Sequence, residues 1–345
     1  MLQNLSGDLH FKNMKQMKLF SVLLIALSFL LNGCNAQTQS DSLKLIKTIQ
    51  LPNVSGRIDH LAYDAKHQKI YVVALGNNTV EVVDLKNNKV IHTIKNLSEP
   101  QGVAYIAESN SIFVANGDNG ECDVFNAETY QKTISIDLTE DADNVRYDSI
   151  SKKIYVGYGN GGIAIIDSKT FKLITKIKLS GHPESFQIDT AAQKIYVNVP
   201  DQKQIEIIDL TKKIVTDKWE MTEASSNFPM CLEAQDHRLF IGCRHSPKLL
   251  VMDTQTGKTI TSYEIDSDID DIFYNTTTKE IYLSCGGGYI DVFKQADANT
   301  YTASGKISTH SGARTSLFIQ EFNQLIIASP SGTNRDAMLL VYEKK

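Results

Sequence analysis

The most informative stretch of this sequence is Ile70-Tyr-Val-Val-Ala-Leu-Gly-Asn-Asn-Thr-Val-Glu-Val-Val-Asp84. β-Branched and aromatic residues dominate both halves, and a Gly-Asn-Asn segment interrupts them, which is typical of two short antiparallel strands joined by a turn. The β-branched or aromatic triplet that opens this stretch recurs seven times, at intervals of 41 to 44 residues. The triplets begin at Ile70, Ile112, Ile154, Ile195, Leu239, Ile281 and Leu325.

Each repeat carries a second marker, an apolar or aromatic residue seven positions before the triplet. These residues are Tyr63, Tyr105, Tyr147, Ile188, Leu232, Tyr274 and Phe318. Another strand is expected to end 13 or 14 residues after most of the triplets, so each unit holds four short strands. Four-stranded units of this length, repeated seven times, predict an all-β fold, a seven-bladed β-propeller.

The last repeat is one strand short, because the chain stops at Lys345 soon after Met338-Leu-Leu-Val-Tyr342. An unmatched strand stands at the other end, Leu43-Lys-Leu-Ile-Lys-Thr-Ile-Gln-Leu51, and it resembles the outer strand of the first repeat, residues 89–97. We therefore predict that the N-terminal strand completes the last blade and closes the ring, which removes an exposed sheet edge. The predicted propeller covers residues 43–345.

The first 33 residues have the pattern of a signal peptide. Lys15 and Lys18 precede thirteen uncharged, mostly apolar residues, 19–31, which form too short a helix, at ~1.5 Å per residue, to span a ~30 Å hydrocarbon core. A charged start, a short apolar middle and a small-residue exit are typical of secretory signal peptides. The alternative starts are Met1, Met14 and Met17.

The exit from this segment, Leu31-Asn-Gly-Cys34, resembles the lipobox of bacterial lipoproteins. That resemblance implies a lipoprotein signal peptide over residues 1–33 and a lipid on Cys34 that anchors the protein to a membrane. The alternative is an ordinary signal peptide followed by an incidental cysteine. Residues 34–42 would then be the lipidated cysteine and a flexible polar tether. The predicted location is the bacterial cell envelope, after export, facing the periplasm or at the surface.

The composition is that of an ordinary globular protein, with 42% hydrophobic and 22% charged residues, which excludes a disordered chain or a multi-span membrane protein. Removing residues 1–33 would take away three lysines and one aspartate and change the formal charge from −5 to −7. This acidic balance opposes a nucleic-acid partner. The remaining cysteines form no Cys-x-x-Cys motif, and we expect them to be small core or edge residues: Cys122, Cys231, Cys243 and Cys285.

The register of the repeats predicts which residues meet on the axis, because the innermost strands of a propeller surround its central channel. Eleven positions before the triplets lie Asp59, Gln101, Asp143, Glu184, Phe228, Asp270 and Arg314. Arg57 and His182 stand two positions before this set, on the same strand face. His60, Asn144 and Asp271 follow it directly, and Arg244 comes from an inner hairpin, residues 242–245.

Crowded carboxylates at one mouth would repel one another, so arginines, raised pKa values or a bound cation must offset them. We predict a ligand site there. Its residues are Arg57, Asp59, His60, Asp143, Asn144, His182, Glu184, Arg244, Asp270, Asp271 and Arg314. The alternative is a set of solvated blade connections in which aspartates cap turns. The oxygen and imidazole donors suit a divalent cation, Ca²⁺, Mg²⁺, Mn²⁺ or Zn²⁺, and the spacing selects none of these.

The triplet followed by Asn-Asn-Thr-Val-Glu-Val-Val-Asp84 resembles the YVTN-repeat propellers, specifically the YncE-like family. The resemblance covers about residues 50–345, and segments 56–60, 141–147, 182–186, 227–230 and 312–316 resemble the interblade segments of an exported subgroup. It implies a seven-bladed ring and no single activity.

The leading functional prediction is a non-catalytic scaffold that binds a small molecule, or an exported protein of the envelope, at the acidic channel mouth. The alternative is a metal-dependent hydrolase or lyase, similar to propeller lactonases. Asp143 or Asp270 would then hold the metal, His182 or His60 would move protons, and Arg314 would bind an anionic group. Gly-x-Ser-x-Gly, His-Glu-x-x-His and P-loop motifs are absent, and the single tryptophan excludes repeated quinone-docking motifs.

Overall fold

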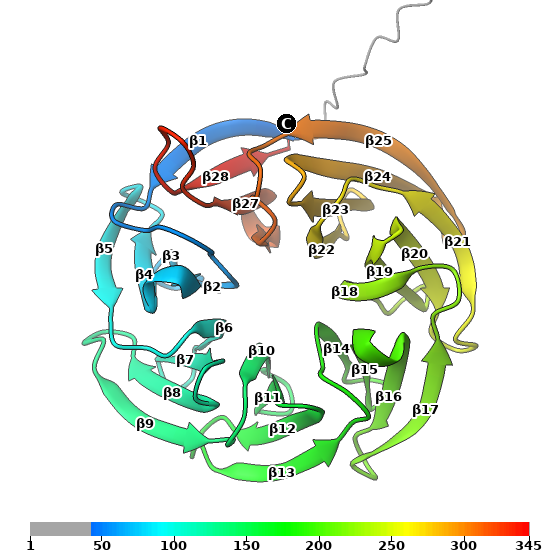
Figure 1. Ribbon diagram of the computed structural model, residues 1–345, viewed down its shortest axis with the longest axis horizontal. Helices are drawn as coiled ribbons and strands as arrows, with labels where there is room; N and C mark the ends of the chain where they lie inside the picture. Colours follow the sequence, from blue (N-terminus) through cyan, green and yellow to red (C-terminus); the bar gives the residue numbers. More distant parts are fainter. Residues whose placement is uncertain (1–42, 345) are drawn as a thin grey trace, which may run out of the picture. The chain divides into compact units, whose positions relative to one another are not determined.

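The computed structural model describes residues 43–344, and within them the chain forms a ring of seven four-stranded antiparallel sheets (Figure 1). This confirms the predicted all-β propeller. The predicted signal peptide, Cys34 and the tether over residues 34–42 lie outside the described residues. In residues 43–344 no helix is long and apolar enough to cross a membrane. The helices there are single 3₁₀ turns: η1 (Leu75–Asn77), η2 (Pro200–Gln202) and η3 (Gln320–Phe322).

Six of the sheets are built from four consecutive strands each, ordered from the axis outward. The strands of the first three are β2 (Leu61–Asp64), β3 (Lys69–Ala74), β4 (Thr79–Asp84), β5 (Lys89–Ile94), β6 (Pro100–Ile106), β7 (Ser111–Asn116), β8 (Glu121–Asn126), β9 (Lys132–Asp137), β10 (Ala142–Asp148), β11 (Lys153–Tyr158), β12 (Gly162–Asp167) and β13 (Leu173–Lys178). Those of the next three are β14 (Phe186–Asp189), β15 (Lys194–Val199), β16 (Gln204–Asp209), β17 (Ile214–Glu220), β18 (Ser225–Glu233), β19 (Arg238–His245), β20 (Pro247–Asp253), β21 (Thr259–Glu264), β22 (Ile269–Asn275), β23 (Glu280–Cys285), β24 (Tyr289–Asp297) and β25 (Thr300–Ser308).

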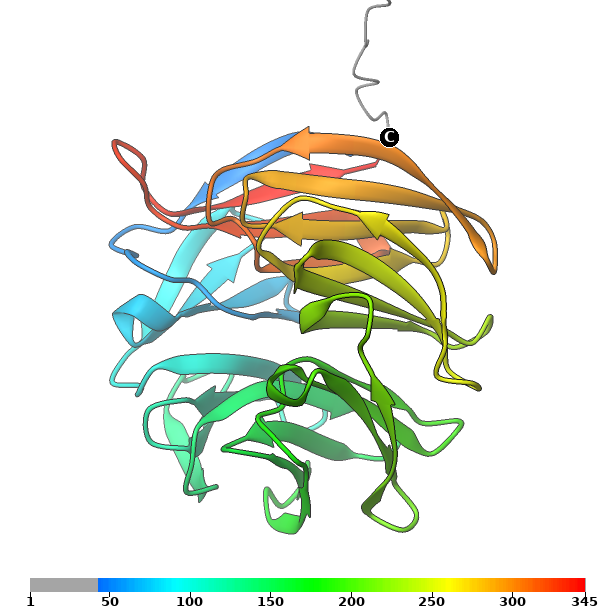
Figure 2. The ribbon, with the colours of Figure 1, turned by 45° about the vertical axis from the view of Figure 1, so that its right-hand side comes forward.

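The seventh sheet joins the two ends of the chain. It consists of β26 (Ser316–Ile319), β27 (Gln324–Ser329), β28 (Met338–Glu343) and β1 (Lys44–Gln50). β1 runs antiparallel to β28, with Gln50 opposite Met338 and Lys44 opposite Glu343, and Figure 2 shows the blue strand lying along the red one. The predicted closure is therefore confirmed. The described ring forms one compact unit, so we expect it to fold on its own.

Asx turns join neighbouring strands. At the end of β4, Asp84 accepts the backbone N–H of Asn87 through Oδ1, at 2.9 Å, and Asn88 adopts a left-handed φ of 53°. Asparagine tolerates this conformation better than most residues, which explains the Asn-rich turns of the sequence.

The two sequence markers of the repeat meet between neighbouring blades. The aromatic residue in the middle of one triplet packs against the residue seven positions before the next triplet. Ring centroids are 5.8 Å apart for Tyr71 and Tyr105, and 5.4 Å apart for Tyr282 and Phe318. Aromatic pairs at such distances contribute beyond their buried area, so these contacts stabilise the joints of the ring.

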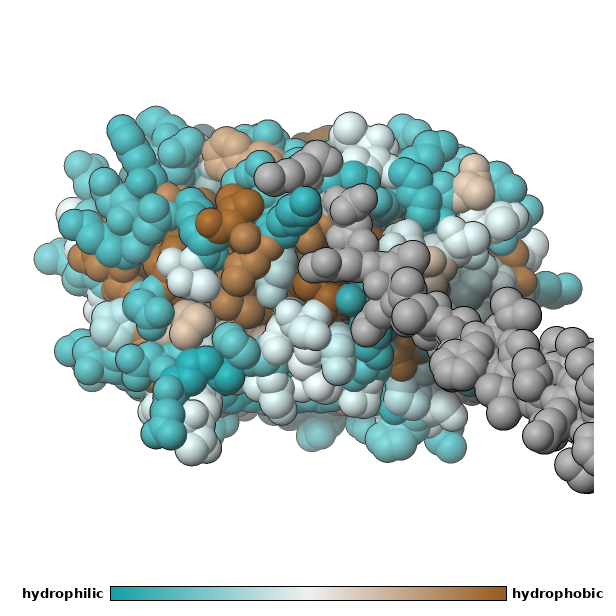
Figure 3. All heavy atoms as spheres, turned by 90° about the horizontal axis from the view of Figure 1, so that it is seen from above, coloured by the Kyte–Doolittle hydropathy of each residue, from teal (hydrophilic) through white to brown (hydrophobic). Residues whose placement is uncertain are grey.

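The outer face of the ring near β1 carries both polar and apolar residues. Figure 3 views the ring from the side of β1 and shows hydrophilic residues around a patch of apolar ones. On β1 itself, Leu45 and Ile46 are 50% and 43% exposed, whereas Ile49 is fully buried. The four cysteines of the described residues form no disulfide; three are buried and Cys231 is half-buried, in keeping with the predicted core and edge positions.

Candidate functional site

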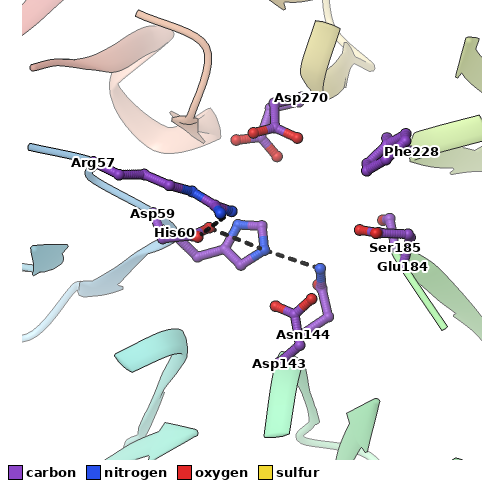
Figure 4. A pocket seen from close by; sticks show the side chains of 10 residues that line it. Arg57, Asp59, His60, Asp143, Asn144, Glu184, Ser185, Phe228 and Asp270 are labelled. Atoms are coloured by element: carbon purple, nitrogen blue, oxygen red, sulfur yellow. Dashed lines mark hydrogen bonds and ion pairs between the residues drawn. The ribbon is translucent and has the colours of Figure 1, made fainter. Parts of the chain in front are cut away.

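The starts of the inner strands line a small cavity of about 20 Å³ at one mouth of the central channel (Figure 4). Its lining residues are Arg57, Asp59, His60, Asp143, Asn144, Glu184, Ser185, Phe228, Asp270 and Asp271. Eight of them belong to the predicted site. The other predicted residues, His182, Arg244 and Arg314, do not line this cavity and instead contact acidic residues that do.

β-Bulges turn neighbouring side chains toward the same space. Asp143 and Asn144 both line the cavity, and so do Asp270 and Asp271, although consecutive residues of a regular strand point to opposite faces. The register shifts between Ala142 and Val145 in β10, and between residues 269 and 271 in β22. An inserted residue re-aims the side chains around it, so the mouth gathers more polar groups than simple alternation allows.

Two arginines hold Asp270. Arg244 donates through Nη2 to Asp270 Oδ1 at 2.5 Å, and Arg314 places Nε 2.9 Å from Oδ2. Arg314 also binds Asp268 through Nη1, at 2.8 Å. The Arg244 guanidinium lies 3.8 Å from the ring centroid of Phe228, a stacking contact that fixes its position. Both oxygens of the Asp270 carboxylate are therefore engaged by arginines. Burial raises the pKa of Asp270, and the charges of the two arginines oppose that rise.

On the first blade, Arg57 Nη2 lies 2.7 Å from Asp59 Oδ2. Burial nevertheless raises the pKa of Asp59 to about 7. Burial also lowers the pKa of His60, so its imidazole is neutral near pH 7 and Nε2 accepts from Asn144 Nδ2, 2.9 Å away. Asn144 is only 3% exposed, and its buried Oδ1 has no hydrogen-bond partner among residues 43–344.

The pKa values of His182 and Glu184 are both raised, for different physical reasons. His182 donates through Nδ1 to the carbonyl of Gly159 at 2.7 Å and places Nε2 3.8 Å from Asp143 Oδ2. The Asp143 carboxylate is the main cause that raises the pKa of His182 to about 9. Burial, followed by the charge of Asp143, raises the pKa of Glu184 to about 8. Within the described part of the chain, the Glu184 side chain forms no ion pair or hydrogen bond.

The structure adds residues that the predicted set did not include. Ser185 and Phe228 also line the cavity. Phe228 lies eleven positions before its triplet, the same register position as Asp59 and Asp143, so the sequence spacing could have identified it. The proposed metal ligands do not form a ready coordination site. In residues 43–344, no group of three or more His, Cys, Asp or Glu side chains is placed to hold a metal ion.

Comparison with curated proteins finds two relatives of low sequence identity. Two curated proteins called "Uncharacterized protein YncE", from Salmonella typhi and Salmonella typhimurium, are 25% and 24% identical to this chain over 229 residues. The aligned part is 62% of this chain and 64% of each relative, so the chain matches less than two thirds of their length. No family model matches the chain.

Solved structures share the fold at low sequence identity. A chain from the crystal structure of a mitotic checkpoint complex superposes with a TM-score of 0.74 at 12% identity, covering 89% of this chain and 94% of its own. A chain of Kuenenia stuttgartiensis hydrazine synthase gives 0.72 at 12% identity, covering 90% and 98%. At this identity the likeness concerns the fold alone. The relatives and the ring of seven four-stranded blades together support a YncE-like β-propeller family for this chain.

Proposed function

We propose that the ring is a ligand-binding scaffold whose channel mouth takes a small molecule with a cationic hydrogen-bond donor, such as a primary ammonium group. The observation that carries this proposal is Asn144 Oδ1, a buried acceptor without a hydrogen-bond partner among residues 43–344, in a cavity that the Asp143 and Glu184 carboxyl groups also line. Arg57, Arg244 and Arg314 are already engaged by carboxylates. Because a buried acceptor without a donor costs about 1–3 kcal/mol, a ligand that donates hydrogen bonds and carries positive charge would stabilise this arrangement.

The size of the cavity favours a single small group over a whole protein surface. Its volume of about 20 Å³ has room for about one water-sized group, such as an ammonium. Blades one, three, four, five and six contribute lining residues, so the site exists only when the ring is closed. A lysine side chain of an exported protein would present the same chemistry, and the experiment below distinguishes the two by using free amines.

The experiment is a thermal-shift series on residues 35–345. The probes are n-butylamine, ethanolamine, spermidine and the chlorides of Ca²⁺, Mg²⁺, Mn²⁺ and Zn²⁺. A ligand present at about 100 times its Kd stabilises the folded state by about 2.7 kcal/mol, so at least one amine should raise the melting temperature measurably. The rise should disappear in the double variant Asp143→Asn, Glu184→Gln.

The matched control is Asp118→Asn with Glu128→Gln, which removes the same two charges from exposed positions. It should keep the rise in melting temperature. An amine shift that survives in the channel variant would place the site elsewhere. The absence of any shift with free amines, alongside capture of a lysine-bearing peptide, would favour the protein partner.

A metal-dependent hydrolase or lyase is the second candidate, and the raised pKa values favour it. Asp59 and Glu184 have pKa values of about 7 and 8, where a carboxyl group can both give and take a proton near neutral pH. Elemental analysis of protein purified without chelator, together with a lactone-hydrolysis assay, tests this candidate. Stoichiometric metal and turnover that both vanish in Asp143→Asn would establish it over the binding scaffold.

We also propose that a lipid on Cys34 holds the ring at a membrane of the bacterial envelope, facing the periplasm or the surface. The support is the sequence of a charged start, an apolar run and a cysteine followed by a polar tether. The full chain should fractionate with membranes and carry the mass of a lipid. Cys34→Ser should move the protein to the soluble fraction, and an unchanged membrane fraction for this variant would contradict lipid anchoring.

A further inference from the structure

A wider compartment follows the acidic mouth along the same channel. Its volume is about 360 Å³, within the ~300–1,000 Å³ range of small-molecule sites. The innermost strand of every blade contributes to its wall. His60 and Asp271 line both this compartment and the mouth, so the two spaces adjoin at these residues.

The wall of this compartment is largely apolar, unlike the mouth. Its apolar residues are Leu61, Ala62, Val103, Ala104, Val145, Met230, Ile272, Phe273 and Leu317. Several polar groups on the wall are already satisfied. Gln187 donates through Nε2 to the carbonyl of Met230 at 2.9 Å, and the hydroxyl of Tyr147 donates to Glu108. Burial raises the pKa of the Cys231 thiol to about 12, so this thiol is neutral.

Arg146, on β10, is the one permanent cation among the residues that line the compartment. Its Nη1 donates to the carbonyl of Val145 at 2.9 Å, and its Nη2 lies 3.4 Å from Ser185 Oγ, a long contact. No acidic side chain within residues 43–344 forms an ion pair with it. Burial lowers its pKa, but a guanidinium group stays charged in proteins.

Asp271 does not neutralise this charge. Its Oδ2 accepts the backbone N–H of Ser316 at 2.7 Å, and burial raises the pKa of this carboxyl well above its ordinary value. Asp143 and Asp271 act on the Arg146 charge only from a distance, because neither forms an ion pair with it. A partly buried charge without a direct counter-ion is unfavourable in an apolar wall, so an anion bound there would be stabilised.

From Arg146 and its apolar surroundings we infer that this compartment binds a small monoanion with an apolar body, such as a carboxylate on an aromatic ring or a short alkyl chain. The carboxylate would pair with the Arg146 guanidinium, whose planar donors match its two oxygens. The hydrocarbon would pack against the apolar wall. A phosphate dianion fits less well, because the wall offers no second permanent cation. This site is distinct from the amine site proposed above, since its ligand carries the opposite charge and pairs with Arg146, although His60 and Asp271 line both spaces.

The test is isothermal titration calorimetry of residues 35–345 with benzoate and hexanoate, and with hexylamine and hexanol as probes of the same apolar size. Both acids should bind, and the amine and the alcohol should bind at least tenfold more weakly in this compartment. Arg146→Met should weaken benzoate binding by about tenfold or more, the loss of one charge-assisted contact. Arg146→Lys, which keeps the charge, should retain part of the affinity.

Lys66→Gln, an equal change of charge on the exposed turn between β2 and β3, is the matched control and should bind benzoate like the unmodified ring. If Arg146→Met does not fold, Leu317→Trp narrows the compartment from another blade and should weaken benzoate binding. Equal binding of benzoate to the unmodified ring and to Arg146→Met would overturn the inference, and so would failure of both acids to bind at millimolar concentration. The double variant Asp143→Asn, Glu184→Gln should still bind benzoate, so loss of the amine site and loss of this site are distinguishable.

Discussion

Replacing Glu184 with glutamine should make the ring more stable at alkaline pH. Burial and the charge of Asp143 raise the pKa of Glu184 from 4.5 to about 8 in the folded state. The folded protein therefore keeps a proton that the unfolded chain releases above pH ~4.5, and stability falls as the pH rises from there through 8. Glutamine mimics the protonated carboxyl and has no proton to lose, so the variant escapes this decline.

The size of the effect follows from the two pKa values. Above pH 8 the full difference between 4.5 and about 8 applies, and at about 1.4 kcal/mol for each pH unit it corresponds to at most about 5 kcal/mol. The Glu184 side chain keeps part of its contact with solvent, which screens its charge, so we expect a gain of about 2 kcal/mol. In a domain of this size that gain corresponds to a melting temperature about 3 °C higher at pH 9.

The assay is urea unfolding followed by circular dichroism, at pH 5, 7 and 9, for residues 35–345 and two variants. Glu184→Gln should match the unmodified ring at pH 5 and exceed it progressively at pH 7 and 9. Glu128→Gln, at an exposed position, should run parallel to the unmodified ring throughout. His182 also loses stabilisation as the pH rises through about 9, so the difference between the curves, rather than either slope, reports on Glu184. Parallel curves for Glu184→Gln would refute the account of a part-buried carboxyl repelled by Asp143.

Two further predictions concern the closure of the ring and the backbone that carries the site. Ile49→Ala removes a fully buried side chain from the closing strand and should lower the free energy of unfolding in urea by about 2–5 kcal/mol. Ile46→Ala, on the same strand but 43% exposed, should lower it by less than about 0.5 kcal/mol. Equal losses in the two variants would contradict closure of the ring by this strand. Gly102→Ala would place a Cβ 2.0 Å from the backbone oxygen of Asp143, so it should cost about 1–3 kcal/mol and weaken amine binding by displacing β10. The control is Gly332→Ala, whose Cβ would meet only a flexible arginine side chain, so the melting temperature and amine binding should stay unchanged. A comparable loss of stability and amine binding in both glycine variants would argue against displacement of β10.

The two compartments give the channel a division of charge along its axis. The mouth is rich in carboxyl groups and the wider compartment holds the single cation Arg146 in an apolar wall. His60 and Asp271 lie where the compartments adjoin, and burial favours the neutral form of both.

Much of the architecture could be predicted from the spacing of residues alone. The triplets and the aromatic residues before them recur because each blade needs the same buried strands and the same contacts with its neighbour, as Tyr71 and Tyr105 show. The missing last strand and the unmatched first one predicted the closure, because a sheet edge left unpaired is unfavourable. Register also brought Asp59, Asp143 and Asp270 to one mouth, since equivalent positions of a ring face the same axis.

Contacts between blades were decided by the tertiary structure. Sequence spacing could not show that Arg244 and Arg314 both bind Asp270, or that Asn144 donates to His60, because each pair joins residues from different blades whose side-chain directions depend on the twist of both sheets. The bulges that turn neighbouring residues of β10 and β22 into one cavity break the alternation on which strand patterns rest. Arg146 carried no sequence signal, because its charge matters through the lack of an ion pair in the described part of the channel, and that is a property of the assembled ring.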